Sequence, residues 1–337
     1  MLKNEQNMIT RIGVIGIGIM GEYHTRVYSE IQKHNPNVHI VGIADIEKNR
    51  VEAIVRKYGI STTCKTYTDY NELIENRSFN QIDRNRNLDA VSICVPTSMH
   101  YKVAIAAMQK GVQHLLIEKP ISDNLNNAND IVKFAKDKGV TISTGHVERF
   151  NPAVIEMKRI IESGRLGQVV SISAKRVGPG PPTFKDTGVI VDLAVHDLDI
   201  ICYLYGACAT DVYAVAGGGK NGLEDRASIM LKFDENRVGL LETNWLTSNR
   251  VRTLDMVGVE AVAHLDYIDQ TIIISTHERD EKIKFVKQEP LMKELTHFVN
   301  VVRGKEEPLV TGEDGINALK LALAAGESYM TGDVIRL

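Results

Sequence analysis

A glycine-rich turn near the N-terminus restricts the fold of this chain more than any other segment. A short apolar run ends in Gly16, Gly18 and Gly21, and a helix-compatible segment follows. In a G-x-G-x-x-G turn, the first glycine permits the tight turn, the second lets the backbone approach a diphosphate, and the third lets the helix pack closely on its strand. The helix N-terminus then attracts the negative charge. The turn predicts a dinucleotide-binding unit whose ligand lies beside Gly16, Gly18, Ile19, Met20 and Gly21.

An acidic residue follows the second apolar run, 38–44, at Asp45. A carboxylate at the end of the second strand accepts hydrogen bonds from the adenosine ribose and repels a 2′-phosphate. The alternative is that Asp45 caps the helix that starts near Glu47. The order strand, turn, helix, strand, Asp favours contact with the cofactor and predicts NAD rather than NADP.

The composition is that of an ordinary globular protein. Of 337 residues, 43% are hydrophobic and 25% are charged, which allows two domains with a core each. The net charge of −3 gives no electrostatic reason to expect nucleic acid or an anionic membrane as a partner. No apolar run approaches bilayer length, and residues 1–7 are polar, so we expect a cytoplasmic protein. The four cysteines lack zinc-ligand spacing, so we expect reduced thiols and no metal site.

The first part of the chain, 1–145, alternates strand and helix patterns. Expected strands are 11–16, 38–44, 89–95, 113–117 and 140–144, and expected helices are 20–34, 47–58, 69–76, 99–110 and 124–138. The strand runs are almost continuously apolar, as in a parallel sheet covered on both faces. We therefore expect an α/β Rossmann domain, a doubly wound parallel sheet, over 1–145.

The pattern changes in the second part, 146–337. Expected elements are a helix at 152–163, a strand at 168–177, a helix at 190–205, successive strands between 211 and 287, and closing helices at 290–303 and 312–330. Consecutive strands indicate an α+β domain with a large open, mainly antiparallel sheet, which would bind substrate. The uncovered face of that sheet predicts a partner subunit, in a homodimer or homotetramer.

Polar residues follow the later strands of the first domain, where ligands of parallel sheets bind. Pro96 and Thr97 would line the cofactor groove, and we place His100, Glu118 and Lys119 there as well. Thr97 or Ser98 could equally be a helix N-cap. Lys119, between Glu118 and Pro120, could donate a hydrogen bond to a substrate hydroxyl or a developing alkoxide. Its alternative role is a surface salt bridge with Glu118.

Two histidines are candidate site residues, one where the domains join and one in the second domain. His146, after the fifth strand, would face the cofactor or be a structural histidine. Asp192 and His196 lie four residues apart on an expected helix and so on one face, with Asp199 continuing the stripe. A carboxylate that orients an imidazole is a minimal general-base pair. A solvated helix face is the alternative.

Together these motifs resemble the Gfo/Idh/MocA oxidoreductases over nearly the whole chain. The resemblance rests on G-x-G-x-x-G, Asp45, Pro96-Thr97, Glu118-Lys119-Pro120, Gly145-His146 and Asp192-x-x-x-His196. It implies a Rossmann domain joined to an open-sheet domain that commonly forms dimers or tetramers. It also implies that Lys119 and His196 are the catalytic pair with Asp192 beside them, and that the bond before Pro120 is often cis.

A narrower resemblance points to the branch of this family that acts on nucleotide sugars. It rests on residues 145–152 and on Arg176-Val177-Gly178-Pro179. Arg149 and Arg176 would then contact the diphosphate or the sugar, since arginine forks match phosphate oxygens. The alternative for both is a surface or interdomain ion pair.

The resulting hypothesis is NAD-dependent oxidation of a secondary hydroxyl of a small-molecule sugar, with a nucleotide sugar as the favoured substrate. His196 would take the hydroxyl proton, Asp192 would favour its imidazolium form, and Lys119 would stabilise the oxyanion; Lys119, Asp192 and His196 would therefore also bind substrate. The alternatives are a free sugar or polyol such as inositol, a nucleotide-linked sugar acid, or a non-catalytic NAD-binding redox sensor.

Overall fold

The computed structural model describes residues 9–75, 88–180, 187–218, 223–234 and 237–337. They form two compact units. The first unit is Met1–Gly145 with Leu291–Ile316, and the second is His146–Pro290 with Asn317–Leu337. The segment Leu291–Ile316 thus lies in the nucleotide-binding unit, whereas the sequence pattern had placed it with the second domain.

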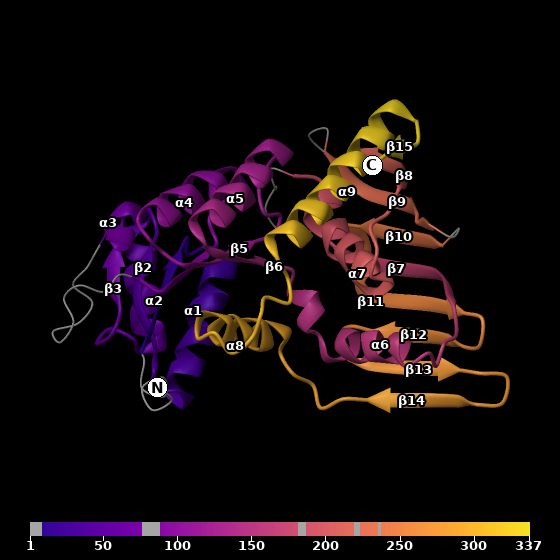
Figure 1. Cartoon of the computed structure of the whole chain (residues 1–337), viewed down its shortest axis with the longest axis horizontal. Coiled ribbons are helices and arrows are strands. Elements are labelled where there is room, and N and C mark those ends of the chain that lie inside the picture. Colours follow the sequence, from indigo (N-terminus) through magenta and orange to yellow (C-terminus); the bar gives the residue numbers. More distant parts are fainter. Residues whose placement is uncertain (1–8, 76–87, 181–186, 219–222, 235–236) are drawn as a thin grey trace. The chain divides into compact units, whose positions relative to one another are not determined.

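A six-stranded parallel sheet forms the centre of the first unit, in the order β3-β2-β1-β4-β5-β6. Its strands are β1 (Thr10–Ile15), β2 (Val38–Ala44), β3 (Lys65–Tyr67), β4 (Ala90–Ile93), β5 (His114–Glu118) and β6 (Thr141–Gly145). Its helices are α1 (Ile19–His34), α2 (Lys48–Tyr58), α3 (Tyr70–Glu75), α4 (Thr97–Gln109), α5 (Leu125–Lys138) and α8 (Pro290–Val302). Helix α1 packs against α2, and α4 packs against α3 and α5 (Figure 1).

Each strand and helix expected in this part of the chain is present, and the α/β Rossmann prediction is confirmed. The central strands form because most of their residues are apolar and buried on both faces; every residue of β1 and of β4 is buried. Only the short edge strand β3 has no expected counterpart, because Lys65 and Thr66 are exposed and give no apolar signal. Since all six strands are parallel, their carboxyl ends lie at one edge of the sheet.

The second unit is built on a nine-stranded sheet, in the order β14-β13-β12-β11-β7-β10-β9-β8-β15. Its strands are β7 (Val169–Pro179), β8 (Asp211–Gly218), β9 (Glu224–Lys232), β10 (Val238–Asn244), β11 (Leu246–Gly258), β12 (Val262–Asp266), β13 (Thr271–Ser275), β14 (Asp280–Lys284) and β15 (Ile335–Arg336). All neighbours are antiparallel except β7 and β10, which are parallel. The expected open, mainly antiparallel sheet is therefore confirmed.

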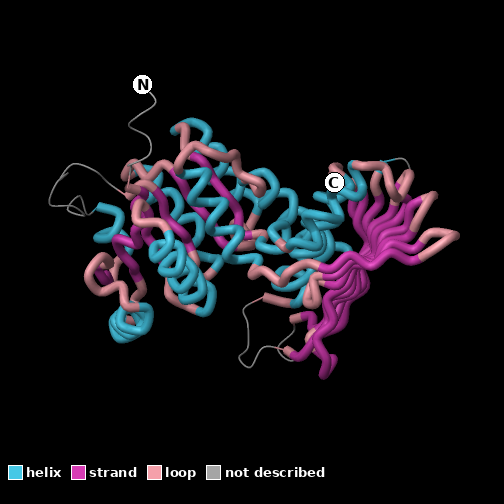
Figure 2. Tube along the Cα trace, turned by 90° about the horizontal axis from the view of Figure 1, so that it is seen from below, coloured by secondary structure: helices cyan, strands magenta, loops and turns pink. Residues whose placement is uncertain are grey.

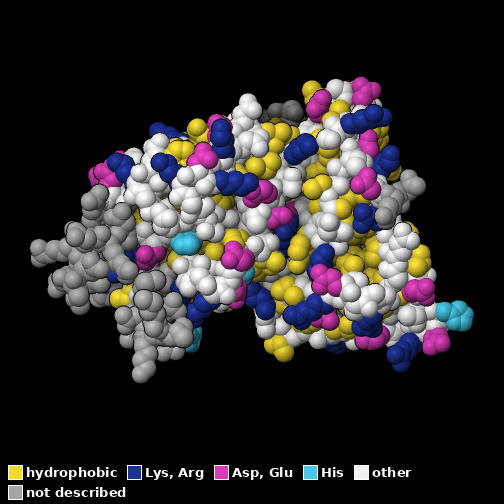
Figure 3. All heavy atoms as spheres, viewed as in Figure 1, with side chains coloured by type: hydrophobic (Ala, Val, Ile, Leu, Met, Phe, Trp, Pro, Cys, Tyr) yellow, Lys and Arg dark blue, Asp and Glu magenta, His cyan; other side chains and the backbone are white. Residues whose placement is uncertain are grey.

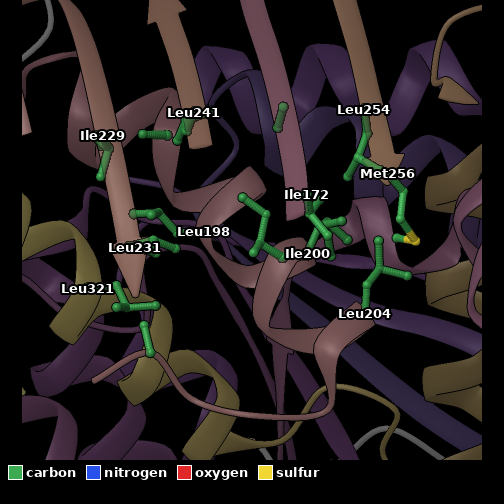
Figure 4. Close-up of a cluster of buried hydrophobic side chains, with 14 of the residues drawn as sticks. Ile172, Leu198, Ile200, Leu204, Ile229, Leu231, Leu241, Leu254, Met256 and Leu321 are labelled. Atoms are coloured by element: carbon green, nitrogen blue, oxygen red, sulfur yellow. The ribbon is translucent and has the colours of Figure 1, made fainter. Parts of the chain in front are cut away.

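Helices cover one face of this sheet (Figure 2). They are a 3-10 turn (Val147–Phe150), α6 (Pro152–Glu162), a π-helical turn (Ile190–Ala194), α7 (Val195–Tyr205) and α9 (Gly312–Thr331), whose first residues belong to the first unit. Strand residues such as Ile172 and Leu231 point toward Leu198, Ile200 and Leu204 of α7 and form the core of the unit (Figure 4).

Charges of both signs are mixed on the visible surface of the described residues (Figure 3). Within the described ranges, no helix combines the length and the apolar character that a bilayer crossing requires.

Candidate functional site

The glycine turn between β1 and α1 has the geometry that a diphosphate requires. Gly16 has a φ of 88°, and a Cβ there would lie 2.7 Å from backbone atoms of Cys94. A Cβ on Gly21 would lie 1.8 Å from the Gly16 carbonyl oxygen, so the helix could not approach its strand. A Cβ on Gly18 would meet nothing within 4 Å, so the backbone there faces open space. This open stretch at a helix N-terminus is the cradle that a dinucleotide diphosphate fits.

Asp45 ties this turn to the end of β2. Its Oδ2 accepts a hydrogen bond from Ile17 N at 2.6 Å, and its Oδ1 accepts one from Glu47 N at 2.9 Å. Arg50 lies 3.3 Å from Oδ1. Helix α2 begins at Lys48 with Glu47 as its N-cap residue, so Asp45 bonds the chain just ahead of the helix. The carboxylate therefore lies between the glycine turn and α2, where the ribose contact was expected.

The residues after β4 differ in whether they are accessible: Pro96 and Thr97 lie at the start of α4, whereas His100 is buried. Pro96 is the N-cap residue of α4 and no side chain caps that helix, so Thr97 begins the helix without acting as its cap. His100 is 1% exposed, and its ring nitrogens lie 2.9 Å from the carbonyl oxygens of Val95 and Pro120. Burial lowers the pKa of His100. The structure thus places His100 beneath the sheet edge, where it holds two loops together, and gives it no exposed surface for the expected cofactor contact.

Lys119 follows β5 at the carboxyl edge, and the Lys119–Pro120 bond is cis, as the resemblance implies. Glu118 is buried; it accepts a hydrogen bond from the Lys119 backbone N at 3.3 Å and pairs with His24 Nε2 at 2.9 Å. Burial alone would raise the pKa of Glu118, but His24 and the charge of Lys119 outweigh it and lower that pKa. A solvated surface ion pair between Glu118 and Lys119 is excluded because Glu118 is buried.

A group of titratable side chains that are buried or half-buried includes Glu118, the neighbour of Lys119. Among the described residues, ligand atoms of His24, Cys94 and Glu118 lie within 4.8 Å of one another. A cation there would require a thiolate, but burial raises the pKa of Cys94 well above its usual value. We therefore assign no metal to this group. Glu294 of α8 is also buried, and neither of its carboxyl oxygens has a hydrogen-bond partner among the described residues.

The second unit supplies Asp192 and His196 from a helix that begins irregularly. The expected helix 190–205 is present, but its first turn is π-helical, so Asp192 lies in the π turn and His196 in α7. Glu224 Oε1 accepts a hydrogen bond from Ile190 N at 3.1 Å and so holds the start of this turn. A Cβ on Gly188 would lie 2.1 Å from that carboxylate. The wider π turn rotates Asp192 relative to a continuous α-helix.

Arg149 and Arg176 do not lie on an open surface. Arg176 is 2% exposed and forms a bidentate pair with Asp197, with Nε–Oδ2 and Nη2–Oδ1 distances of 2.5 and 3.2 Å. Its Nη1 donates to Glu148 at 2.9 Å. Arg149 forms a second bidentate pair, with Asp199, at 2.9 and 2.6 Å. The expected substrate contacts are corrected accordingly: these guanidinium groups are engaged by internal carboxylates.

These pairs bear on two further expectations. Asp199 is 3% exposed, so it belongs to the core of the unit and does not extend a solvated stripe from Asp192. His146 is 1% exposed, with Nδ1 3.9 Å from Asp199 Oδ2. Within the second unit its side chain packs beside the Arg149 pair, and its contact with the cofactor stays a prediction.

Comparison with known proteins identifies the family. A profile described as "Oxidoreductase family, NAD-binding Rossmann fold" matches residues 10–146, and a GFO/IDH/MocA C-terminal domain profile matches residues 154–264. The chain belongs to the Gfo/Idh/MocA oxidoreductases. It is 27% identical over 323 residues to UDP-N-acetylglucosamine 3-dehydrogenase of Acidithiobacillus ferrooxidans, covering 93% of this chain and 95% of that one. A solved structure of that enzyme has a TM-score of 0.83 and covers 95% of this chain and 98% of its own.

Another Gfo/Idh/MocA relative acts on a different class of substrate. Myo-inositol 2-dehydrogenase of Thermotoga maritima is 28% identical over 340 residues, covering 94% of this chain and 96% of that one. The family relationship establishes an NAD-binding oxidoreductase, and its relatives are dehydrogenases of sugar or polyol hydroxyls.

Some supporting residues of this Gfo/Idh/MocA site were absent from the sequence-based expectations. His24 lies one helical turn after Gly21, and that spacing alone could have placed it on the face of α1 that packs on the sheet. Glu224 gave no comparable signal, because its bond to Ile190 joins segments far apart in the sequence.

Proposed function

We propose that this oxidoreductase oxidises a secondary alcohol of a sugar by transferring a hydride from the carbon that bears the hydroxyl to NAD, with Lys119, His196 and Asp192 as the catalytic residues. One observation supports it most strongly. The glycine turn, Asp45, Thr97 and Lys119 all follow strands of one parallel sheet, so they share its carboxyl edge. A lysine at the edge that binds the cofactor is suited to act on a substrate bound there.

Each residue would have a separate chemical role in the proposed reaction. NAD, when bound, accepts the hydride. Lys119 would donate a hydrogen bond to the substrate oxygen and stabilise the negative charge that develops as the proton leaves. His196 would take that proton, and Asp192 would favour the imidazolium that results. Glu118 contributes indirectly, since its bonds to His24 and to the Lys119 backbone hold the loop in place.

The proposed substrate is a nucleotide sugar. Similarity to UDP-N-acetylglucosamine 3-dehydrogenase over 93% of this chain supports this class. A free polyol such as inositol is the competing class, supported by similarity to myo-inositol 2-dehydrogenase. Competition by UDP alone separates them, because only a nucleotide-sugar enzyme should be inhibited by it.

The catalytic assignment is tested with His196→Ala and Lys119→Ala. We expect kcat to fall by roughly 10²- to 10⁴-fold in each, with NAD affinity retained in His196→Ala. Exposed residues of the same types, His277→Ala and Lys110→Ala, are the matched controls and should keep full turnover. Full activity in His196→Ala or Lys119→Ala would remove that residue from the mechanism.

We further propose that a second copy of this chain covers the outer face of the nine-stranded sheet, in a homodimer or homotetramer. Tyr213, Met230 and Leu240 are cross-strand partners on β8, β9 and β10, and they are 39%, 50% and 38% exposed. Such a row of large apolar side chains is typical of an interface. Light scattering should show an oligomer that Met230→Glu dissociates; a monomeric wild-type protein would contradict the proposal.

A further inference from the structure

Three arginines lie together on the helix-covered face of the second unit. Arg176 of β7 and Arg252 of β11 are direct cross-strand partners, so their side chains share a face. Arg250 belongs to the same face, because a Cβ on Gly178, two residues after Arg176, would lie 3.5 Å from Arg250 Cα and 3.6 Å from its Cβ. We call Arg250 and Arg252 the β11 arginine pair.

The carboxylates within this group do not balance its positive charge. Arg176 takes both oxygens of Asp197 and also one oxygen of Glu148. Arg252 reaches only that same Glu148 oxygen, at 3.7 Å, and Arg250 has no ion-pair partner among the described residues. Three guanidinium groups therefore share two carboxylates.

The excess positive charge is costly because one of its groups, Arg252, is partly buried. The Arg252 side chain is 31% exposed. Burial, followed by the positive charges of Arg176 and Arg250, lowers the pKa of Arg252. Half-buried like charges repel one another unless an anion neutralises them. The described residues supply no further carboxylate at the β11 arginine pair, so the complementary anion would come from a ligand.

The position of the pair connects it with the proposed catalytic residues. Asp197, which binds Arg176, directly follows His196 in α7. From Arg176 the arginines continue to Arg252 on the next strand and then to the more exposed Arg250. A substrate with its hydroxyl at His196 could therefore extend along β11 toward the pair.

We propose that Arg250 and Arg252 form the subsite for the phosphate groups of a nucleoside diphosphate sugar. The inference rests on the proposed function and deepens it by assigning residues to the anionic part of the substrate. Two guanidinium forks match the oxygens of a diphosphate, whereas a neutral polyol would leave the excess charge uncompensated. The subsite takes the role that the sequence had given to Arg149 and Arg176, which internal carboxylates engage.

The test is a titration of the NAD-loaded protein with UDP and with inorganic pyrophosphate by calorimetry. Arg252→Gln and Arg250→Gln should each weaken UDP binding by about 10- to 100-fold, because a hydrogen-bonded charge pair is lost. NAD affinity should stay unchanged, and KM for the nucleotide sugar should rise far more than kcat falls. Arg252→Lys should recover part of the affinity, since it restores the charge without the fork.

Arg165→Gln is the matched control. Arg165 pairs with Glu281 in the same unit and is about as exposed as its partner, at 41% and 43%. The Arg165→Gln variant should bind UDP with the affinity of the wild type. If Arg252→Gln does not fold, as judged by circular dichroism, the exposed Arg250→Gln still decides the question.

The outcomes separate this inference from the proposed function. Equal UDP affinity in the wild type and in both arginine variants would overturn the subsite while leaving a nucleotide-sugar enzyme in place. A wild type that binds neither UDP nor pyrophosphate but oxidises a neutral polyol would overturn the nucleotide-sugar proposal, and the subsite with it.

Discussion

An added methyl group should lower stability at Gly21 of the glycine turn but not at Gly18. At Gly21 the new Cβ would lie 1.8 Å from the Gly16 carbonyl oxygen, whereas at Gly18 it would meet nothing within 4 Å. We therefore expect Gly21→Ala to destabilise the first unit and Gly18→Ala to leave its stability unchanged. Both variants should bind NAD more weakly, because each alters the cradle for the diphosphate.

The magnitudes follow from these distances. Alanine is favoured over glycine inside a helix by about 0.5–1 kcal/mol. At Gly21 a contact of 1.8 Å forces the backbone apart, and overpacking of this kind costs about 1–3 kcal/mol, so a net loss of about 1–2 kcal/mol remains. At Gly18, the N-cap residue of α1, a poorer cap offsets the lower entropy of the unfolded chain, and the net change is about zero. Loss of charged hydrogen bonds to the diphosphate weakens NAD binding by about 10- to 100-fold.

Urea unfolding followed by two probes distinguishes the units. The only tryptophan, Trp245, lies in the second unit, so its fluorescence reports on that unit alone, while circular dichroism reports on both. Gly326→Ala is the control, since a Cβ there meets nothing within 4 Å and Gly326 lies in α9. It should be neutral or slightly stabilising and leave NAD affinity unchanged.

Two results would refute this reasoning. A Gly21→Ala protein as stable as the wild type would mean that α1 does not approach β1 as closely as described. Unchanged NAD affinity in Gly18→Ala, measured by calorimetry, would mean that the diphosphate does not approach the backbone at Gly18.

Three further predictions concern buried or engaged carboxyl groups. Asp197→Ala leaves the buried charge of Arg176 without its main partner and should lower the free energy of unfolding by about 3–5 kcal/mol in urea titrations. The control is Lys175→Ala, which removes an exposed pair with Glu242 worth at most about 1 kcal/mol. A smaller loss in Asp197→Ala than in this control would contradict the prediction. Burial, followed by the charge of Glu118, raises the pKa of Glu294 well above its usual value, so the unfolded chain loses this proton first as the pH rises. The free energy of unfolding then falls by up to about 1.4 kcal/mol per pH unit above the pKa that Glu294 has in the unfolded chain. Glu294→Gln should show a shallower fall between about pH 5 and pH 8. Parallel pH–stability curves for the wild type and this variant would exclude a contribution from Glu294. Asp45→Ser should weaken NAD binding and reduce the preference for NAD over NADP in direct titrations, and an unaltered preference would remove Asp45 from the ribose site.

The sequence predicted those parts of the fold that local patterns determine. Apolar runs identified the strands of the parallel sheet, and glycine spacing identified the turn at Gly16, because in both cases neighbouring residues decide the structure. The π turn at Ile190–Ala194 has no such local code, since it is fixed by Glu224 from a distant strand. A helical pattern alone cannot distinguish it from an α turn.

The ion pairs could not be predicted for the same reason, because their partners are decided by contacts that only the fold creates. Arg149 and Arg176 have the chemistry of phosphate ligands, and only the fold shows that Asp199 and Asp197 occupy them. The pattern of α8 shows one apolar face but not which domain that face covers. Glu294 was not expected in a core, because a carboxylate on a helix is ordinarily exposed.

The placement of Leu291–Ile316 in the first unit has a consequence for biosynthesis. As the chain leaves the ribosome, residues 1–145 emerge without α8, and without Thr311, whose backbone oxygen accepts a hydrogen bond from the Thr144 hydroxyl at 2.9 Å. The nucleotide-binding unit can be completed only after nearly all of the second unit has been translated. Its nascent form must therefore persist with an unfinished core through most of synthesis, during which a chaperone could engage the apolar surface that α8 later covers.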